Sequence, residues 1–372
     1  MRSGKILLVG GYGHVGTVLA HELAVRYPGQ LIIAGRHCDL AEALAATLPG
    51  GADAAQVDVR DEASVKLAAQ HAQLMVNCSL DQRTPTLLRA AFANASAYLD
   101  IGANAGAIAG MLALSTEAAQ YGTCALVGAG LDPGCTNMLA ALASARAGGA
   151  HAINVALLLS QGDAFGEVAI DYILEALAYP TTVDYLGQRQ ELYAYRERRH
   201  CEFPLPYGRK LAYRFPFPEQ AFFAETLQAK RAANWYAMDS AAINTLLAAA
   251  VRLGLTRLLR HAGVRATTRW LFQQLSRLPG GKDDVCALAE AQGPNGTWRV
   301  SLTSHQESKT TALCTLPIVE ALFEGRLDQP GVWLPEQVVD PTVYLHALSD
   351  LGLEVQILSK DERDKKEAGT NG

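Results

Sequence analysis

The chain has 372 residues, of which 49% are hydrophobic and 19% charged, so it is globular and too long for one typical core. Its net charge of −5 gives no footprint for nucleic acid or an anionic membrane, and no apolar run reaches the length of a membrane span. The seven cysteines are scattered without Cys-x-x-Cys spacing, which predicts reduced thiols in the cytoplasm and no metal site.

The first predicted element is a buried strand that runs into a glycine-rich turn and then a helix. Apolar residues 6–9 precede Gly11, Gly13 and Gly16, which have the spacing Gly-x-Gly-x-x-Gly, and residues 17–24 continue with helical periodicity. We expect Gly11 to permit the tight turn, Gly13 to let the backbone approach a pyrophosphate, and Gly16 to let helix and strand pack closely. The pyrophosphate would lie at the helix start. The predicted cofactor-binding residues of this segment are Gly11, Tyr12, Gly13, His14, Val15 and Gly16.

The second predicted strand, residues 30–36, indicates which dinucleotide binds. NAD sites usually carry Asp or Glu at the end of this strand for the ribose hydroxyls, whereas here Gly35 is followed by Arg36. A guanidinium pairs with the 2′-phosphate that a carboxylate would repel, and His37 adds a further donor. The alternative is that Arg36 is a solvated strand-end residue. The missing acid and the added base together favour NADPH.

Strand and helix continue to alternate through the first half, which predicts an α/β fold with a doubly wound parallel Rossmann sheet. Right-handed crossovers would bring the strand ends to one rim, where ligands bind. Asp58 follows the third strand, where its carboxylate would meet the adenine amino group or, equally well, cap the next helix. After the fourth strand, the chain is expected to pass the nicotinamide ribose at Cys78, Ser79 and Leu80.

The regular alternation of strands and helices ends after residue 146, which predicts a second, α+β domain. A strand at 153–159, a long helix at 240–259 and a hairpin at Pro294-Asn-Gly296 indicate a mixed or antiparallel sheet with helices on one face. The other face of such a sheet is a candidate dimer contact, so we expect a homodimer. The predicted parts are an NADP-binding Rossmann domain at 1–147 with 310–345 packing back on it, a substrate and dimerisation domain at 148–309, and a disordered tail at 359–372.

Three segments resemble the saccharopine dehydrogenase and reductase family. They are the strand end 97–102, the loop 127–137 with its Asp-Pro-Gly turn, and residues 319–336 with the sequence Gly-Val-x-x-Pro-Glu. The resemblance covers the Rossmann half and the last quarter, while residues 160–280 match poorly. It implies NAD(P)-linked chemistry on a carbon–nitrogen bond, either reduction of an imine or the reverse reaction.

Substrate identity stays open at this point. One branch of imine reductases reduces a thiazoline ring on carrier-bound siderophore precursors. The many aromatic residues of the middle region would suit such an aromatic substrate, but they would equally suit a sheet core or a dimer contact. An amino-acid-derived imine, as in saccharopine-type dehydrogenases, is the other substrate. A non-catalytic NADPH-sensing Rossmann protein is the alternative class of function. We therefore expect a small-molecule or carrier-protein-bound substrate.

Reduction of an imine needs a proton donor near the nitrogen. Asp132 is the first candidate because it follows the sixth strand on the ligand rim, although it would serve as well to cap the next helix. Tyr98 at the end of the fifth strand and His200 in the second domain are the other catalytic candidates. Backbone N–H groups at a helix start bind carboxylates. The predicted substrate-binding residues are Gly134, Cys135, Asn137 and Arg209.

Overall fold

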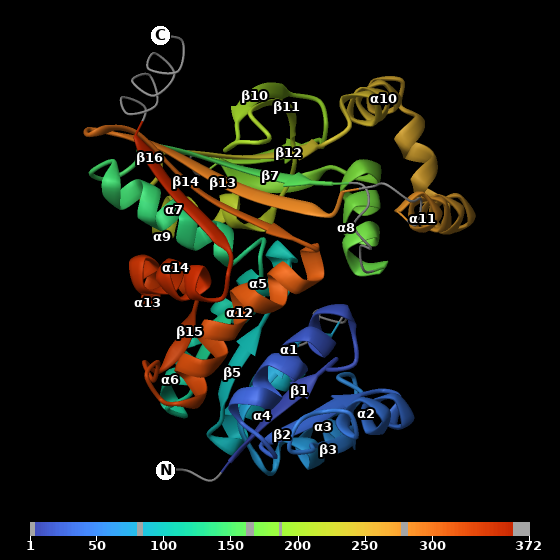
Figure 1. The fold of residues 1–372 in the computed structure, drawn as a ribbon, viewed down its shortest axis with the longest axis vertical. Coiled ribbons are helices and arrows are strands. Elements are labelled where there is room, and N and C mark those ends of the chain that lie inside the picture. The colour runs from blue at the N-terminus through green and yellow to red at the C-terminus, as the bar shows by residue number, and fades with distance from the viewer. Residues whose placement is uncertain (1–3, 80–84, 161–166, 186–187, 277–281, 360–372) are drawn as a thin grey trace. The chain divides into compact units, whose positions relative to one another are not determined.

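The computed structural model describes residues 4–79, 85–160, 167–185, 188–276 and 282–359 (Figure 1). The predicted cofactor residue Leu80 and the predicted tail after Ser359 lie outside the described residues; Ser359 itself ends a strand. The chain divides into two compact units, residues 1–135 with 311–340 and residues 136–310 with 341–372. Within the described ranges, no helix is both long enough and apolar enough to cross a membrane.

The first unit is built on a seven-stranded sheet in the order β15-β6-β5-β4-β1-β2-β3, in which every pair is parallel. This confirms the predicted Rossmann sheet. Its strands are β1 (Lys5–Val9), β2 (Leu31–Gly35), β3 (Asp53–Gln56), β4 (Ala72–Asn77), β5 (Ala97–Asp100), β6 (Cys124–Val127) and β15 (Gly331–Trp333). Its helices are α1 (His14–Arg26), α2 (Cys38–Ala45), α3 (Glu62–Ala69), α4 (Thr86–Asn94), α5 (Ala105–Leu112), α6 (Ser115–Gln120) and α13 (Pro335–Val338).

The core of this unit follows from the apolar strands. Ile6, Leu7 and Leu8 of β1 have no exposed surface, because β1 lies between β2 and β4 and has helices on both sides of the sheet. The register aligns Val9 with Ala34 on one side and with Asn77 on the other. The ends of β2 and β4 therefore flank the glycine turn that follows β1.

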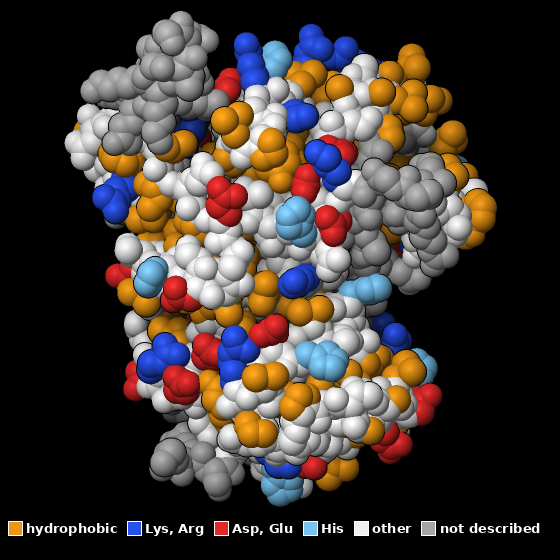
Figure 2. Space-filling model, in the orientation of Figure 1, with side chains coloured by type: hydrophobic (Ala, Val, Ile, Leu, Met, Phe, Trp, Pro, Cys, Tyr) orange, Lys and Arg blue, Asp and Glu red, His pale blue; other side chains and the backbone are white. Residues whose placement is uncertain are grey.

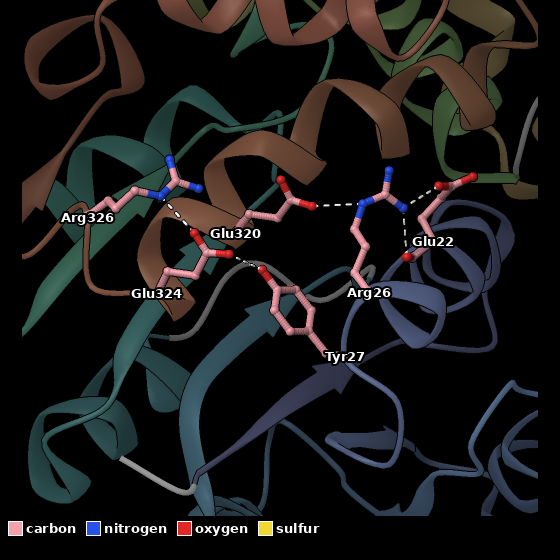
Figure 3. A network of polar contacts seen from close by, with 6 residues as sticks. All are labelled: Glu22, Arg26, Tyr27, Glu320, Glu324 and Arg326. Carbon is pink, nitrogen blue, oxygen red and sulfur yellow. Dashed lines mark hydrogen bonds and ion pairs between the residues drawn. The ribbon is translucent and has the colours of Figure 1, made fainter. Parts of the chain in front are cut away.

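A segment from near the end of the chain completes the first unit. Helix α12 (Glu307–Phe323) leads into β15, which pairs with β6. Figure 3 shows how α12 is held against α1: Arg26 Nε lies 2.8 Å from a Glu320 oxygen, and the Tyr27 hydroxyl donates to Glu324 at 2.7 Å. The Tyr27 ring also packs edge-on against Phe323, with 5.0 Å between ring centroids. These contacts fix a segment that is separated from α1 by almost 300 residues along the chain.

The second unit contains a seven-stranded mixed sheet in the order β10-β11-β12-β7-β13-β14-β16. Only the β12–β7 pair is parallel; the other described pairs are antiparallel. The predicted mixed sheet and its 294–296 hairpin turn are thus confirmed. The strands are β7 (Ala152–Leu159), β10 (Arg198–Glu202), β11 (Arg209–Arg214), β12 (Arg231–Met238), β13 (Asp284–Gly293), β14 (Gly296–His305) and β16 (Glu354–Ser359), with a separate β8 (Thr181–Tyr185) and β9 (Gln188–Leu192) pair.

One helix of the second unit is shorter than the sequence predicted. The stretch 240–259 is not a single helix: α10 ends at Arg252, Gly254 adopts a left-handed φ of 74°, and a 3-10 turn follows. Glycine takes that conformation without a Cβ penalty, which ends the helix here. The helical elements are α7 (Cys135–Arg146), α8 (Glu167–Ala178), η1 (Pro218–Ala221), α9 (Phe223–Thr226), α10 (Ala241–Arg252), η2 (Leu255–Arg260), α11 (Ala262–Ser276) and α14 (Pro341–Asp350).

Most aromatic side chains of the middle region form the core of the second unit. Tyr195, Phe215 and Tyr236 are at most 1% exposed, and their rings pack on one another with centroids 5.4–6.5 Å apart. Tyr195 also stacks on Tyr213 at 4.7 Å. Of the three roles that the sequence left open for these residues, namely a substrate contact, a sheet core and a dimer contact, the structure supports the core for these side chains.

Candidate functional site

The glycine turn after β1 begins one residue earlier than the sequence predicted. Gly10, rather than Gly11, takes the positive φ of the turn, at 78°. A Cβ at Gly10 would lie 2.8 Å from the Cys78 carbonyl, and one at Gly11 would lie 2.9 Å from the Leu8 carbonyl. Both positions therefore exclude a side chain: the backbone after β4 lies against Gly10, and the backbone of β1 itself lies against Gly11.

The other two glycines behave as the motif predicts. A Cβ at Gly16 would collide with the Gly10 carbonyl and with Gly11, so this glycine lets α1 pack against the turn. Gly13 precedes α1, and a Cβ there would meet only the Gly10 carbonyl, at 3.1 Å. The outer side of Gly13 is thus open to a close approach by a ligand.

Helix α1 presents a suitable end for a pyrophosphate. Its first hydrogen bond runs from the Thr17 N–H to the Gly13 carbonyl, and its first turn contains no acidic residue. The first N–H groups of a helix have no partner within it and attract anions. The turn, the open face at Gly13 and the acid-free helix start fit a dinucleotide phosphate.

The end of β2 shows why an acidic residue is missing there. A Cβ at Gly35 would lie 2.5 Å from the Tyr12 ring, so the ring occupies the space of a side chain. The Tyr12 hydroxyl then accepts a hydrogen bond from the His37 N–H at 3.0 Å, and Gln56 Nε2 donates to the Arg36 carbonyl at 3.2 Å. These bonds fix the backbone of the loop, while the side chains of Arg36 and His37 are exposed to solvent. An exposed guanidinium beside a rigid loop suits a 2′-phosphate.

Asp58 does not cap the helix that follows β3. Its carboxylate accepts from the Arg60 N–H at 3.0 Å, and its own N–H donates to Ser64. The capping residue of α3 is Asp61, whose side chain accepts from the Ala63 N–H. The structure thus removes the capping alternative and leaves the adenine contact of Asp58 as a prediction.

A buried carboxylate organises the ends of β4 and β5. Asp100 is 1% exposed and accepts three hydrogen bonds, from Asn77 Nδ2 at 2.7 Å, from the Tyr98 hydroxyl at 2.8 Å and from the Gly102 N–H at 2.6 Å. Asn77 in turn accepts from the Ser79 N–H at 3.0 Å and from its hydroxyl at 2.6 Å. Through Asn77, the carboxylate of Asp100 fixes the backbone at the predicted cofactor residue Ser79.

Burial sets the protonation of this cluster. Desolvation and the nearby charge of Asp100 raise the pKa of the Cys78 thiol and of the Tyr98 hydroxyl far above their ordinary values. Burial also raises the pKa of Asp100, although its three donors oppose that shift. Cys78 therefore stays a thiol, and Tyr98, which is 2% exposed and donates to Asp100, is poorly placed to give a proton to a substrate. Sequence alternation placed Tyr98 and Asp100 on one face but could not show this bond.

The loop after β6 corrects one prediction about the substrate site. The Cys135 N–H donates to the Gly130 carbonyl at 2.9 Å, so it is not available to a substrate carboxylate. The cause is local: the loop folds back on itself, and a Cβ at Gly134 (φ 124°) would collide with Gly130. Asp132 is half-buried in this loop, and α7 begins only at Cys135. Asp132 thus lies in the loop after the carboxyl end of β6, as predicted, and its catalytic role stays a prediction.

The remaining candidates lie in the second unit. Asn137, in the first turn of α7, is fully buried. His200 and Arg209 are exposed on the β10–β11 hairpin, where Arg209 lies 3.6 Å from Glu202, its cross-strand neighbour. That ion pair gives Arg209 a local partner already. The catalytic role of His200 and the substrate contacts of Asn137 and Arg209 stay predictions.

The fold and the glycine turn define a Rossmann-type dinucleotide-binding protein. Residues 6–126 match the family model described as the saccharopine dehydrogenase NADP binding domain. The match confirms the NADP cofactor and, for these residues, the resemblance noted in the sequence: they form an NADP-binding domain of the saccharopine dehydrogenase type. No curated protein sequence matches the chain significantly.

Two solved structures share the fold over nearly the whole chain. The apo saccharopine dehydrogenase (L-Glu forming) from Saccharomyces cerevisiae has a TM-score of 0.69 at 14% identity, covering 96% of this chain and 100% of that one. The homospermidine synthase from Legionella pneumophila, in complex with NAD, has a TM-score of 0.68 at 15% identity, covering 96% of this chain and 92% of that one. At these identities the likeness establishes the α/β fold of both units.

Proposed function

We propose that this protein is an NADPH-dependent reductase of a carbon–nitrogen double bond. The observation that carries the proposal is an NADP-binding domain of the saccharopine dehydrogenase type whose glycine turn and β2 loop fit a phosphorylated dinucleotide. The two similar structures are, by their names, a saccharopine dehydrogenase and a homospermidine synthase. Saccharopine and homospermidine each contain a nitrogen joined to two carbon chains, which supports chemistry on a C–N bond.

The bound cofactor would supply hydride to the substrate carbon. The chain would contribute position and a proton. The start of α1 would hold the pyrophosphate, and Arg36 would pair with the 2′-phosphate. Asp100, through Asn77, keeps the end of β4 in the shape that the nicotinamide ribose meets. Asp132, in the loop after β6, would protonate the substrate nitrogen and so make the neighbouring carbon a better hydride acceptor.

Within this class, the substrate we propose is an imine formed from an amine and a keto acid or aldehyde. The hypothesis that the substrate is a thiazoline ring depended on the aromatic residues of the middle region. Tyr195, Phe215 and Tyr236 are core residues, so they give no reason to prefer an aromatic substrate. The thiazoline ring therefore stays an alternative substrate of the same reaction.

The activity is tested by mixing the protein with NADPH and amine–carbonyl pairs and following NADPH oxidation. Turnover with any pair, lost in Asp132→Asn with NADPH affinity retained, supports the proposal. Quenching of NADPH fluorescence without turnover on any imine, including thiazolines, identifies the NADPH-sensing alternative instead.

Cofactor choice has its own test in Arg36→Ala. Loss of a charge-assisted pair costs about 1.5–3 kcal/mol, so the NADPH dissociation constant should rise roughly 10- to 100-fold while that for NADH changes less than about threefold. Arg89→Ala, which removes an exposed arginine of α4, is the matched control and should change neither. Equal losses for both cofactors in Arg36→Ala would contradict the 2′-phosphate contact.

A further inference from the structure

The second unit exposes an unusual amount of apolar surface along α10, η2 and α11. Seven of the fifteen large hydrophobic side chains that are exposed in the described chain fall within residues 246–271. Figure 2 shows hydrophobic side chains gathered where α10 lies in Figure 1, whereas acidic and basic side chains are interspersed over much of the rest of that face. The seven are Leu246, Leu253, Leu255, Leu258, Val264, Trp270 and Leu271. We refer to them as the apolar arm.

Helix α10 carries apolar side chains on its solvent-exposed face as well as on its buried face, which is the pattern of a helix covered on more than one side. Its inner face, with Asn244 and Ala248, is buried in the second unit. Its outer face carries Ala242, Leu246 and Ala249, all exposed, and Leu253 at its end is 75% exposed. A helix of this composition leaves an outer face that needs a partner.

The outer residues have the spacing of a helix-pairing seam. Positions 242, 246, 249 and 253 are separated by four, three and four residues, which is the a/d spacing of a coiled coil. Small and large side chains alternate along the seam as Ala, Leu, Ala, Leu. We infer that this seam pairs with the same seam of a second copy of the chain, in antiparallel orientation, and that the apolar arm is the dimer interface.

The antiparallel orientation follows from the order of side chains. A twofold axis between residues 247 and 248 places each leucine of one copy opposite an alanine of the other: Leu246 against Ala249, and Leu253 against Ala242. Such an interface uses the same patch twice and is self-complementary. A parallel pairing would instead oppose leucine with leucine and alanine with alanine.

Charge favours the same arrangement. Residues 241–276 contain no Asp or Glu, so a parallel pair would bring the two Arg252 side chains together. In the antiparallel pair, these residues are nine positions apart along the axis, about 14 Å at 1.5 Å per residue. That separation exceeds the Debye length of about 8 Å at physiological salt, so their repulsion is screened.

The area is sufficient for a stable dimer. From the exposed fractions of its seven side chains, the apolar arm offers on the order of 500–600 Å² of apolar surface. An interface of standard size buries about 800 Å² per partner, and homodimer interfaces are about 65% apolar, so the arm supplies the apolar area of a standard-size homodimer interface.

A membrane would be the other obvious occupant, but three of the five arginines in residues 241–276 bind groups of their own unit. Arg269 lies 2.8 Å from Asp171 of α8, Arg265 donates to the Leu259 carbonyl, and Arg260 donates to the Ala178 carbonyl. A membrane-surface helix keeps its basic side chains on the lipid-facing rim. Here these three bind their own unit, and the exposed seam is uncharged apart from Arg252 at its edge.

The test is the mass of the full-length protein at about 10 µM, by light scattering or sedimentation equilibrium. We expect twice the chain mass of 39.7 kDa for the wild type, and at least a 100-fold rise in the dimer dissociation constant for Leu246→Glu. Leu67→Glu is the matched control: Leu67 is 69% exposed, as Leu246 is 70% exposed, but it lies on α3 of the first unit. A monomeric wild type, or a Leu246→Glu variant that stays dimeric, overturns the inference.

Orientation is tested by cross-linking. A mixture of Leu246→Cys and Ala249→Cys proteins should form a disulfide between the two variants under mild oxidation more readily than either protein alone, with oxidised wild type as the background. Faster linkage within Leu246→Cys alone overturns the antiparallel seam. Binding of a monomeric wild type to vesicles of anionic lipid, abolished by Leu246→Glu, would assign the arm to membranes and overturn the dimer.

Discussion

Asp100 is the position of the first unit where a single substitution should cost most. Its carboxylate is the common acceptor for Asn77, Tyr98 and the Gly102 N–H, all within 2.6–2.8 Å, and it is 1% exposed. Asp100→Ala leaves three donors buried without an acceptor. Each such donor costs about 1–3 kcal/mol, so the free energy of unfolding should fall by about 3–6 kcal/mol after local relaxation.

Two further variants allow the predicted losses in free energy of unfolding to be ranked. Asp100→Asn keeps the shape but turns one acceptor into a donor; Asn77 cannot rotate to receive it, because its own oxygen already accepts from Ser79. We expect a loss of about 2–3 kcal/mol. Tyr98→Phe removes one donor and leaves the carboxylate with two, so it should cost about 1 kcal/mol. The predicted order of destabilisation is Asp100→Ala, then Asp100→Asn, then Tyr98→Phe.

Urea titrations give the free energies, and thermal melts provide a second measurement. For a unit of this size, each kcal/mol lowers the melting temperature by roughly 2–4 °C, so Asp100→Ala should lose roughly 6–24 °C. NADPH affinity should fall in the same order, since the same hydrogen bonds fix the backbone at Ser79. If Asp100→Ala is no less stable than Tyr98→Phe, the three-donor reasoning is refuted.

Two more substitutions test packing and charge elsewhere. Gly35→Asp, the change that would normally introduce an NAD preference, should weaken both NADH and NADPH in binding titrations, because its Cβ displaces the Tyr12 ring and breaks the bond to the His37 N–H; a gain in NADH affinity would contradict this packing. Glu290→Gln should cost about 1–3 kcal/mol at pH 7. Burial raises the Glu290 pKa, but Arg299 and Arg199 outweigh burial and hold it below its usual value. That stabilisation is complete above about pH 4.5 and is lost as the pH falls through the folded pKa of Glu290. In urea titrations, the difference in free energy of unfolding between wild type and Glu290→Gln should therefore shrink at low pH. A difference that does not depend on pH would exclude the ion pairs as its source.

The first half of the fold was predictable because its signals are local. The central strands of the parallel sheet are short apolar runs, and the glycine spacing is read directly from neighbouring positions. β15 was missed, since three residues carry no periodicity and its place beside β6 depends on the rest of the sheet. The long helix at 240–259 was wrong for a related reason: apolar spacing continues past Gly254, although the backbone does not.

The candidate site was less predictable, because its decisive contacts depend on loop conformation and on pairing between strands, which sequence periodicity does not give. Nothing near Cys135 in the sequence shows that the Gly130 carbonyl turns back to take its N–H. The bond from Asn77 to Asp100 crosses from β4 to β5, and sequence alternation could place Asp100 on a face without giving it partners. Burial of the aromatic residues likewise depends on how the strands assemble.

Cofactor preference in this chain follows from packing as well as from charge. The Tyr12 ring fills the space above Gly35, and its hydroxyl binds the loop that carries Arg36. A side chain at position 35 therefore requires the Tyr12 ring to move, in addition to any repulsion between a carboxylate and a 2′-phosphate. Because Tyr12 lies within the glycine turn itself, the residues that bind the pyrophosphate also constrain which ribose the protein accepts. An acidic residue at position 35 would thus displace the Tyr12 ring from the loop that carries Arg36, unless Tyr12 is changed with it.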